Sequence, residues 1–290
     1  RADTGDFSFV GASFITTRDQ IDPFATPEVG SYAYRRFVAG GSLSLGTGHL
    51  LAIGQVKLND GPWELAEDFE GYSGLLKYSA PLGNGDFQVS LNVFDASWNP
   101  TEQIPERLIG TALCEDSFCS LDGTQNGFTR RQILTAGYES DSWRITAYAQ
   151  HYDWELLSNF TYFLEDPVNG DQLRQYADLW TYGGRIEHTA QLSDTLSLRV
   201  GAEGRYDDIA RVGFDETIEG LKEFTVGAFA VDETSLGTYA EVIWEPIDRL
   251  MLIGGIRNDW YGFDASGLEG AATWDGDVSD DALGLKFGAN

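Results

Sequence analysis

Histidine is the side chain most often used for proton transfer near neutral pH, and this chain of 290 residues has three: His49, His151 and His188. None of them has a serine or cysteine partner at a spacing typical of nucleophilic catalysis. His151 alternates with Asp153 and Glu155, which is typical of one face of a strand, and we assign that face to a wet lumen. The sequence predicts no catalytic residues, and we expect the protein not to be an enzyme.

The two cysteines, Cys114 and Cys119, lie in a polar segment with Glu115 and Asp116. No histidine or further cysteine lies near them in the sequence, so a zinc site would lack ligands. We favour a disulfide that closes a small loop in an oxidising compartment, with free thiols as the alternative. The sequence predicts no bound metal and no cofactor.

Residues 165–171 are rich in carboxylates and contain a glycine, so they offer the oxygen atoms that Ca²⁺ prefers. Their spacing is not that of an EF-hand loop. We therefore favour a solvated loop over a calcium site for this stretch.

The elements that position these residues are visible in the alternation of side chains. Between residues 196 and 207, the even positions are apolar, aromatic or glycine, and the odd positions carry Arg199, Glu203, Arg205 and Asp207. A strand points alternate side chains to opposite faces, whereas a helix would scatter these charges all round. The stretch is therefore predicted to be a strand with one apolar and one charged face.

The same pattern recurs in pairs of strands whose two ends are joined differently. Short turns are expected at residues 46–48, 83–86, 140–142, 193–195 and 245–248, and longer connections at 60–70, 99–130, 162–181, 212–234 and 264–281. Several runs are long enough for the roughly 9 to 11 residues that a tilted strand needs to cross a bilayer. Short turns at one end and long loops at the other are typical of outer-membrane barrels. We predict an all-β, antiparallel up-and-down transmembrane β-barrel, here an incomplete piece of about 12 strands.

Composition narrows the possible partners. The formal charge is −27, from 46 acidic and 19 basic residues, which argues against nucleic acid because phosphate binding needs a cationic surface. No run of apolar residues approaches the roughly 18 that a membrane helix requires. Barrel strands hide their apolar residues at alternate positions, so this absence excludes only a helical membrane protein.

The alternation also assigns the two faces of the sheet. Lipid would meet the apolar positions, among them Leu198, Val200, Leu236, Val242 and Ile256. A charge on that side costs about 2–4 kcal/mol at the membrane midplane, so the charged positions must face the lumen. The residues assigned to the lumen, where they would contact a plug, are Arg185, Glu187, Arg199, Glu203, Arg205, Asp207, Glu241, Arg257 and Asp259.

Several stretches resemble TonB-dependent outer-membrane receptors. Residues 5–17 look like the last strand of the plug domain of those receptors, and the other stretches resemble a bacterial branch of the family; these are residues 59–64, 76–79, 98–107, 158–164, 169–172, 204–209, 236–241 and 254–259. The resemblance spans nearly the whole chain. It implies residues 1–20 as the last strand of the plug and residues 21–290 as the N-terminal half of a barrel of about 22 strands.

The resemblance further implies a protein of the bacterial cell outer membrane that imports a scarce nutrient, most simply a ferric siderophore, with energy from TonB. Its partners would be TonB, its own plug domain, outer-membrane lipid and a small nutrient ligand. We expect most of the plug, the TonB box and the later strands to lie outside this sequence. Binding residues concentrate on loops held by a rigid scaffold, so the candidate ligand contacts are those of the predicted outer loops: Glu106, Arg107, Asp171, Gln172 and Arg174.

Two alternatives remain open at the level of sequence. A passive porin or structural outer-membrane barrel would share the strand pattern without energy coupling. A soluble secreted β-protein that binds carbohydrate through exposed aromatic residues is a third interpretation.

Overall fold

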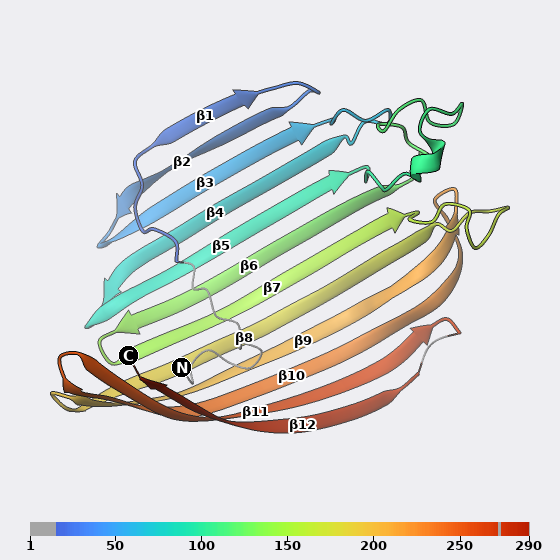
Figure 1. Cartoon of the computed structure of the whole chain (residues 1–290). Helices are drawn as coiled ribbons and strands as arrows, with labels where there is room; N and C mark the ends of the chain where they lie inside the picture. The colour runs from blue at the N-terminus through green and yellow to red at the C-terminus, as the bar shows by residue number, and fades with distance from the viewer. Residues whose placement is uncertain (1–15, 272–273, 290) are drawn as a thin grey trace.

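Each strand pairs with the strand that follows it in the sequence, so a single antiparallel sheet runs from β1 to β12 in chain order (Figure 1). The computed structural model describes residues 16–271 and 274–289. The strands are β1 (Phe24–Val29), β2 (Arg35–Leu45), β3 (Gly48–Asn59), β4 (Phe69–Leu82), β5 (Gly85–Trp98), β6 (Asn126–Ser140), β7 (Trp143–Ser158), β8 (Leu173–Ser193), β9 (Leu196–Ile218), β10 (Leu221–Ile247), β11 (Leu250–Glu269) and β12 (Gly276–Ala289). The all-β, up-and-down prediction and its twelve strands are confirmed.

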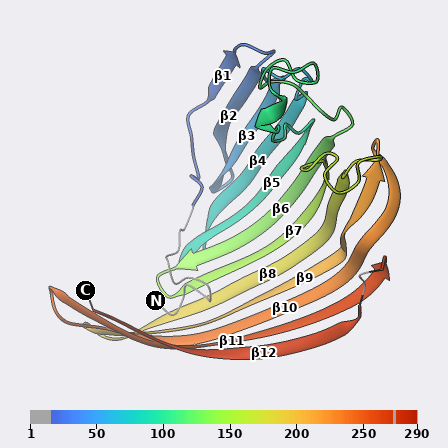
Figure 2. The same cartoon turned by 45° about the vertical axis from the view of Figure 1, so that its right-hand side comes forward.

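The sheet curves into a trough and does not close (Figure 2). Among the described residues, β1 and β12 each pair with one strand only, so both edges of the sheet are open. The total of about 22 strands therefore stays a prediction.

The turns at one end of the sheet follow from their glycines. Gly46 and Gly83 occupy the first turn position after β2 and β4, with φ of 64° and 65°. A positive φ at this position matches the twist of the flanking strands, and glycine adopts it without a steric penalty. These turns therefore set the register of their hairpins.

Two of the predicted long loops are wrong. Most of residues 212–234 belongs to β9 and β10, which meet at a two-residue turn where Glu219 and Gly220 have φ of 49° and 80°. Residues 264–281 are likewise mostly strand, and residues 173–181 and 126–130 extend β8 and β6. We infer that these strands extend beyond the part of the sheet that is predicted to cross the membrane. With water on both faces, the residues there need not alternate between apolar and polar types, although the hydrogen bonds between the strands continue. Register shifts between Thr225 and Gly227 and between Phe229 and Val231 blur the pattern further.

The predicted plug strand falls mostly outside the described residues. Residues 1–15 are not described, and residues 16–20 contain no strand. The division of the chain at residue 20 stays a prediction.

The two faces of the sheet differ in exposure as well as in chemistry. On one face the large apolar side chains are exposed, for example Leu236 (50%), Val242 (43%) and Ile256 (46%). On the other face the charged side chains are covered, for example Glu241 (1%) and Arg257 (3%). Side chains on the concave side of a curved sheet converge and cover one another, so we call the charged face the inner face and the apolar face the outer face.

Among the described residues, no helix combines the length and the apolar character needed to span a membrane.

We predict that Val200→Arg destabilises the complete protein in a bilayer by about 2–4 kcal/mol, because it places a charge on the lipid side. The control is Gln150→Arg on the inner face, where Gln150 pairs with Thr181. The free energy of unfolding in lipid vesicles measures both. Equal costs for the two substitutions would refute the assignment of the faces.

Candidate functional site

The nine charges assigned to the lumen share the inner face of β8–β11 and lie in cross-strand rows. Arg185 pairs in register with Glu203, and Arg199 pairs with Glu241. Antiparallel pairs on one face lie close enough for opposite charges to attract each other. The alternation in the sequence thus becomes a surface of ordered ion pairs.

One part of this surface is centred on the carboxylate of Glu187, which is 4% exposed. Arg185 Nη2 donates to Glu187 Oε2 at 2.9 Å, and the hydroxyl of Tyr239 donates to the same oxygen at 2.6 Å. Arg199 Nε lies 3.7 Å from Glu187 Oε1, and Arg199 Nη1 donates to Glu241 Oε1 at 3.0 Å. The buried carboxylates are therefore matched by guanidinium groups and a phenol, as buried charges must be.

A second part is centred on Arg257. Its Nε donates to Asp259 Oδ2 at 2.8 Å, and its Nη2 donates to Asp259 Oδ1 at 2.6 Å and also to Glu203. Arg257 is 3% exposed, so the charge of this guanidinium is balanced by two carboxylates away from bulk water.

Arg205 is more accessible. It donates to Asp207 through Nε at 2.7 Å and Nη2 at 2.9 Å, and Asp207 also accepts from the hydroxyl of Thr181 at 2.6 Å. The Arg205 side chain is 55% exposed whereas that of Asp207 is 6% exposed. Of the four arginines predicted to face the lumen, Arg205 has the most exposed side chain.

Glycines make room for the large inner-face side chains. A Cβ on Gly201 would lie 2.4 Å from the ring of Tyr239, its cross-strand partner. A Cβ on Gly237 would lie 2.2 Å from Arg257 Nη2 and 2.7 Å from Asp259 Oδ1. The charge network therefore depends on the absence of side chains at these two positions.

Lys77 on β4 links the inner face to the first described residues. Its Nζ donates to the carbonyl of Thr17 at 3.0 Å and lies 2.8 Å from Asp19 Oδ1, and Lys77 is 2% exposed. Its ion pair holds the pKa of Asp19 below the ordinary value. The end of segment 1–20 thus lies against the inner face of the sheet.

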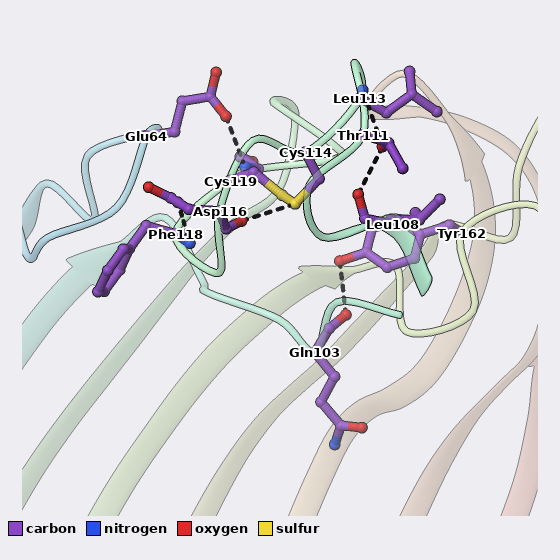
Figure 3. The surroundings of a disulfide bond; sticks show 11 residues. Glu64, Gln103, Leu108, Thr111, Leu113, Cys114, Asp116, Phe118, Cys119 and Tyr162 are labelled. Carbon is purple, nitrogen blue, oxygen red and sulfur yellow. Dashed lines mark hydrogen bonds between the residues drawn. A yellow bond between two sulfur atoms is a disulfide. The ribbon is translucent and has the colours of Figure 1, made fainter. Parts of the chain in front are cut away.

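The loop end of the sheet is built from loops 60–68, 99–125 and 159–172 (Figure 1). Loop 99–125 contains the short 3₁₀ helix η2 (Glu106–Leu108) and a disulfide between Cys114 and Cys119 (Figure 3). Its Phe118 accepts a hydrogen bond from the Glu64 N–H at 2.8 Å through its carbonyl, and its ring lies 5.7 Å from that of Trp63. The disulfide-closed turn therefore rests on loop 60–68.

Loop 99–125 is also joined to loop 159–172. The hydroxyl of Tyr162 donates to the carbonyl of Gln103 at 3.0 Å (Figure 3). The Asn159 N–H donates to Glu102 Oε2 at 2.9 Å, and Asn159 Nδ2 donates to Asp122 Oδ2 at 2.8 Å. Burial raises the pKa of Tyr162 to about 12, so its hydroxyl remains a donor at neutral pH.

The five candidate ligand contacts have different surroundings. Glu106 and Arg107 are exposed in η2, at the loop end where they were expected. Asp171 accepts from Asp166 N at 2.7 Å, Leu164 N at 2.8 Å and Thr161 Oγ1 at 2.7 Å. Despite the opposing effect of burial, these hydrogen bonds lower the pKa of Asp171, so this carboxylate organises its own loop.

Gln172 and Arg174 have internal partners. Gln172 is 3% exposed, and its Oε1 accepts from Thr217 Oγ1 at 2.9 Å, which joins loop 159–172 to the tip of β9. Arg174 was expected on a loop, but it lies in β8 and donates to the buried Asp215 at 2.5 Å. The prediction of its loop position is wrong, because β8 begins before the alternating part of its sequence. A ligand role for the five residues stays a prediction.

The assignment of His151 to the lumen is also wrong. His151 pairs in register with Trp180 and stacks on it with ring centroids 4.7 Å apart. Trp180 has the parity of the exposed Ile186, opposite to that of Glu187. His151 therefore lies on the outer face together with Asp178, whose Oδ1 is 2.8 Å from His151 Nε2. Polar side chains on this face indicate that this part of the strands lies beyond the band of apolar residues.

Sequence reasoning missed several residues of this region. Tyr239 could have been found, because it shares the parity of Glu241. The cluster of Glu102, Asp122 and Asn159 could not, because its members lie far apart in segments without alternation. Within residues 16–271 and 274–289, no group of three or more His, Cys, Asp or Glu side chains could hold a metal ion. Chemically, the site offers a fixed array of charges and hydrogen-bond donors suited to holding a polar body.

The family model "TonB dependent receptor-like, beta-barrel" matches residues 59–289. A search of curated proteins found no match. Solved structures with the same fold include the ferric-catecholate import receptor Fiu from Escherichia coli K12 in its closed form, with a TM-score of 0.67, 13% identity, and coverage of 94% of this chain and 48% of that one. The ferric yersiniabactin uptake receptor FyuA from Yersinia pestis matches with a TM-score of 0.68 and 14% identity over 94% of this chain and 45% of that one, and the ferric citrate transporter FecA in its unliganded form matches with a TM-score of 0.70 and 12% identity over 91% and 40%. The chain therefore spans less than half the length of these proteins.

We predict that Gly237→Ala destabilises the complete protein by about 1–3 kcal/mol, because the new Cβ displaces Arg257 from Asp259. The control is Gly204→Ala on the adjacent strand, where a Cβ would meet nothing closer than 3.8 Å. Denaturant unfolding in detergent measures both variants. If the two midpoints agree, the network does not depend on the space at Gly237.

Proposed function

The chain belongs to the TonB-dependent receptor-like β-barrel family, and from this premise we propose that it is part of an outer-membrane receptor of a Gram-negative bacterium. In this proposal the complete protein binds a scarce nutrient at the cell surface and imports it with energy delivered by TonB. The observation that carries the proposal is the inner face, where buried ion pairs line a trough whose outer face is apolar. A wall of fixed charges is suited to holding a polar plug, and an apolar outer face is suited to lipid.

A ferric siderophore is the proposed substrate class. Fiu, FyuA and FecA are described as import receptor, uptake receptor and transporter of ferric compounds, which supports an iron ligand for this chain. Capture would fall to exposed side chains at the loop end, of which Glu106 and Arg107 are the proposed contacts. The disulfide and the contacts among loops 60–68, 99–125 and 159–172 would hold these contacts in place.

A plug domain is the proposed partner of the inner face. Lys77 already holds Thr17 and Asp19 of the segment proposed to end the plug. The exposed guanidinium of Arg205, which already donates to Asp207 through Nε and Nη2, would also donate to the plug within the trough. TonB would act on the plug, and outer-membrane lipid would contact Val200, Leu236 and their neighbours on the outer face.

The proposed function is tested by growth on single nutrient sources. A strain lacking the intact gene is supplied with ferric siderophores, cobalamin or oligosaccharides, with a TonB deletion as the paired control. We expect growth on a ferric siderophore to be lost in both strains. Uptake that needs this protein but survives without TonB would instead indicate a passive pore, and unchanged iron-limited growth would refute the siderophore.

The proposed contact with the plug makes a separate prediction. Replacing Arg205 and Arg257 together with alanine should loosen the plug of the complete protein and speed its cleavage by added protease several-fold. The control variant combines Arg130→Ala with Arg211→Ala. Both arginines lie on the outer face, where Arg130 pairs in register with Asp153 and Arg211 with Asp178. Plug cleavage at the wild-type rate in the first variant would contradict this role for the inner face.

A further inference from the structure

Loop 99–125 is held from two sides at the loop end of the sheet. On one side the carbonyl of Phe118 accepts from the Glu64 N–H at 2.8 Å, and the Ser120 N–H donates to Glu64 Oε2 at 3.2 Å. On the other side the last residues of the loop are joined to the β9–β10 tip (residues 216–222), although β7 and β8 lie between β6 and β9. This second connection runs through one side chain, that of Gln172, which immediately precedes β8.

The amide of Gln172 has both its donor and its acceptor positions occupied. Nε2 donates to Asp122 Oδ2 at 2.9 Å and to Thr124 Oγ1 at 2.7 Å, and both partners belong to loop 99–125. Oε1 accepts from Thr217 Oγ1 at 2.9 Å and from the Gly220 N–H at 2.8 Å, and both of these belong to the β9–β10 tip. Gln172 is 3% exposed, so bulk water is kept from these contacts. We call these five residues the Gln172 link.

The partners fix the direction in which the amide points. A charged Asp122 can only accept and the Gly220 N–H can only donate, so exchanging Nε2 with Oε1 would place like groups opposite each other on both sides. Burial raises the pKa of Asp122, but hydrogen bonds from Asn159, Thr124 and Gln172 outweigh burial and hold this pKa below its ordinary value. Asp122 is therefore charged at neutral pH, and the link requires an uncharged group with a donor on one side and an acceptor on the other.

Among the described residues, no hydrogen bond runs from loop 99–125 to the β9–β10 tip except through Gln172. The tip nevertheless lies close to the loop, because a Cβ added to Gly220 would be 3.8 Å from Thr124 Cβ. A buried polar group that loses its partner costs more than the hydrogen bond contributes, so the two segments should separate when the amide is removed. One side chain thus decides whether this side of the loop is held.

We propose that Gln172 is the positioning residue for ligand capture: it joins loop 99–125 to the β9–β10 tip, so that η2 presents Glu106 and Arg107 at a fixed place. Gln172 does not contact the ligand itself, because its amide is buried and fully used. This role differs from the ligand contact expected from the sequence. The inference rests on the proposed function for the capture step, whereas the link can be measured without a ligand.

The link is tested by the distance between spin labels on Gly123→Cys and Leu221→Cys in the complete protein in detergent. Both positions are exposed, and a Cβ at Gly123 would meet nothing within 4 Å; the disulfide-bonded cysteines do not take the label. We expect a narrow distance distribution with Gln172 present. Gln172→Met keeps the approximate shape of the side chain without its hydrogen bonds and should broaden the distribution several-fold. The matched control, Gln175→Met on β8, should leave it narrow.

Gln172→Glu separates loss of the link from a general loss of structure. At neutral pH the new carboxylate faces the charged Asp122, so the distribution should be as broad as in Gln172→Met. Burial and the charge of Asp122 raise the pKa of the new carboxyl, so at about pH 5 it should hold a proton, donate to Asp122 and restore a narrow distribution. Gln172→Met should stay broad at both pH values. Glu102 also titrates near this contact, so the protein with Gln172 is measured at both pH values as the baseline.

The consequence for capture is measured by iron uptake in cells, with the ferric siderophore that supports growth in the experiment above. Gln172→Met should raise the concentration for half-maximal uptake several-fold and leave the maximal rate unchanged, because the link orders the capture surface and takes no part in later steps. A narrow distribution in Gln172→Met, or no narrowing of Gln172→Glu in acid, overturns the link. An unchanged half-maximal concentration despite a broad distribution overturns the role in capture. If no siderophore supports growth, the proposed function fails, while the label distances still decide the link.

Discussion

The antiparallel hydrogen-bond ladder from β1 to β12 is the constraint on which the rest of the structure depends. Because side chains alternate strictly along each strand, the ladder sorts one sequence into two surfaces of opposite chemistry. Residues paired in register lie on the same face, so the separation continues from one strand to the next: Arg185 pairs with Glu203, and Arg199 pairs with Glu241. A slip by one residue would exchange the two faces and bring charges to the lipid side.

The inner face inverts the usual arrangement of a protein interior. Charged and phenolic side chains such as Glu241 and Tyr239 are covered there, whereas large apolar side chains are exposed on the outer face. Such burial is tolerable only where each charge has a partner, which the clusters around Glu187 and Arg257 provide. Gly201 and Gly237 are part of the same solution, since a side chain at either position would occupy the space of Tyr239 or Arg257.

The loop end is held together by different means. Here polar and apolar residues no longer alternate along the sequence, and the contacts are a disulfide, an aromatic pair and hydrogen bonds from buried amides. Gln172 extends the linkage to the tip of β9 through Thr217. Rigid loops would then present exposed side chains such as Arg107 to a ligand.

Alternation alone determined the class of fold, the strand order and the assignment of residues such as Arg199 and Val200 to opposite faces, because a period of two is a local property of the chain. It failed where strands leave the predicted membrane: Arg174 and residues 212–234 were assigned to loops, and His151 to the wrong face. In those parts polar side chains lie on both faces, as His151 does on the outer face and Thr181 on the inner face, so polarity no longer distinguishes the two faces while the ladder continues. Only the tertiary structure decided that Glu102, Asp122 and Asn159 meet, because loop contacts between distant segments follow from packing and not from spacing.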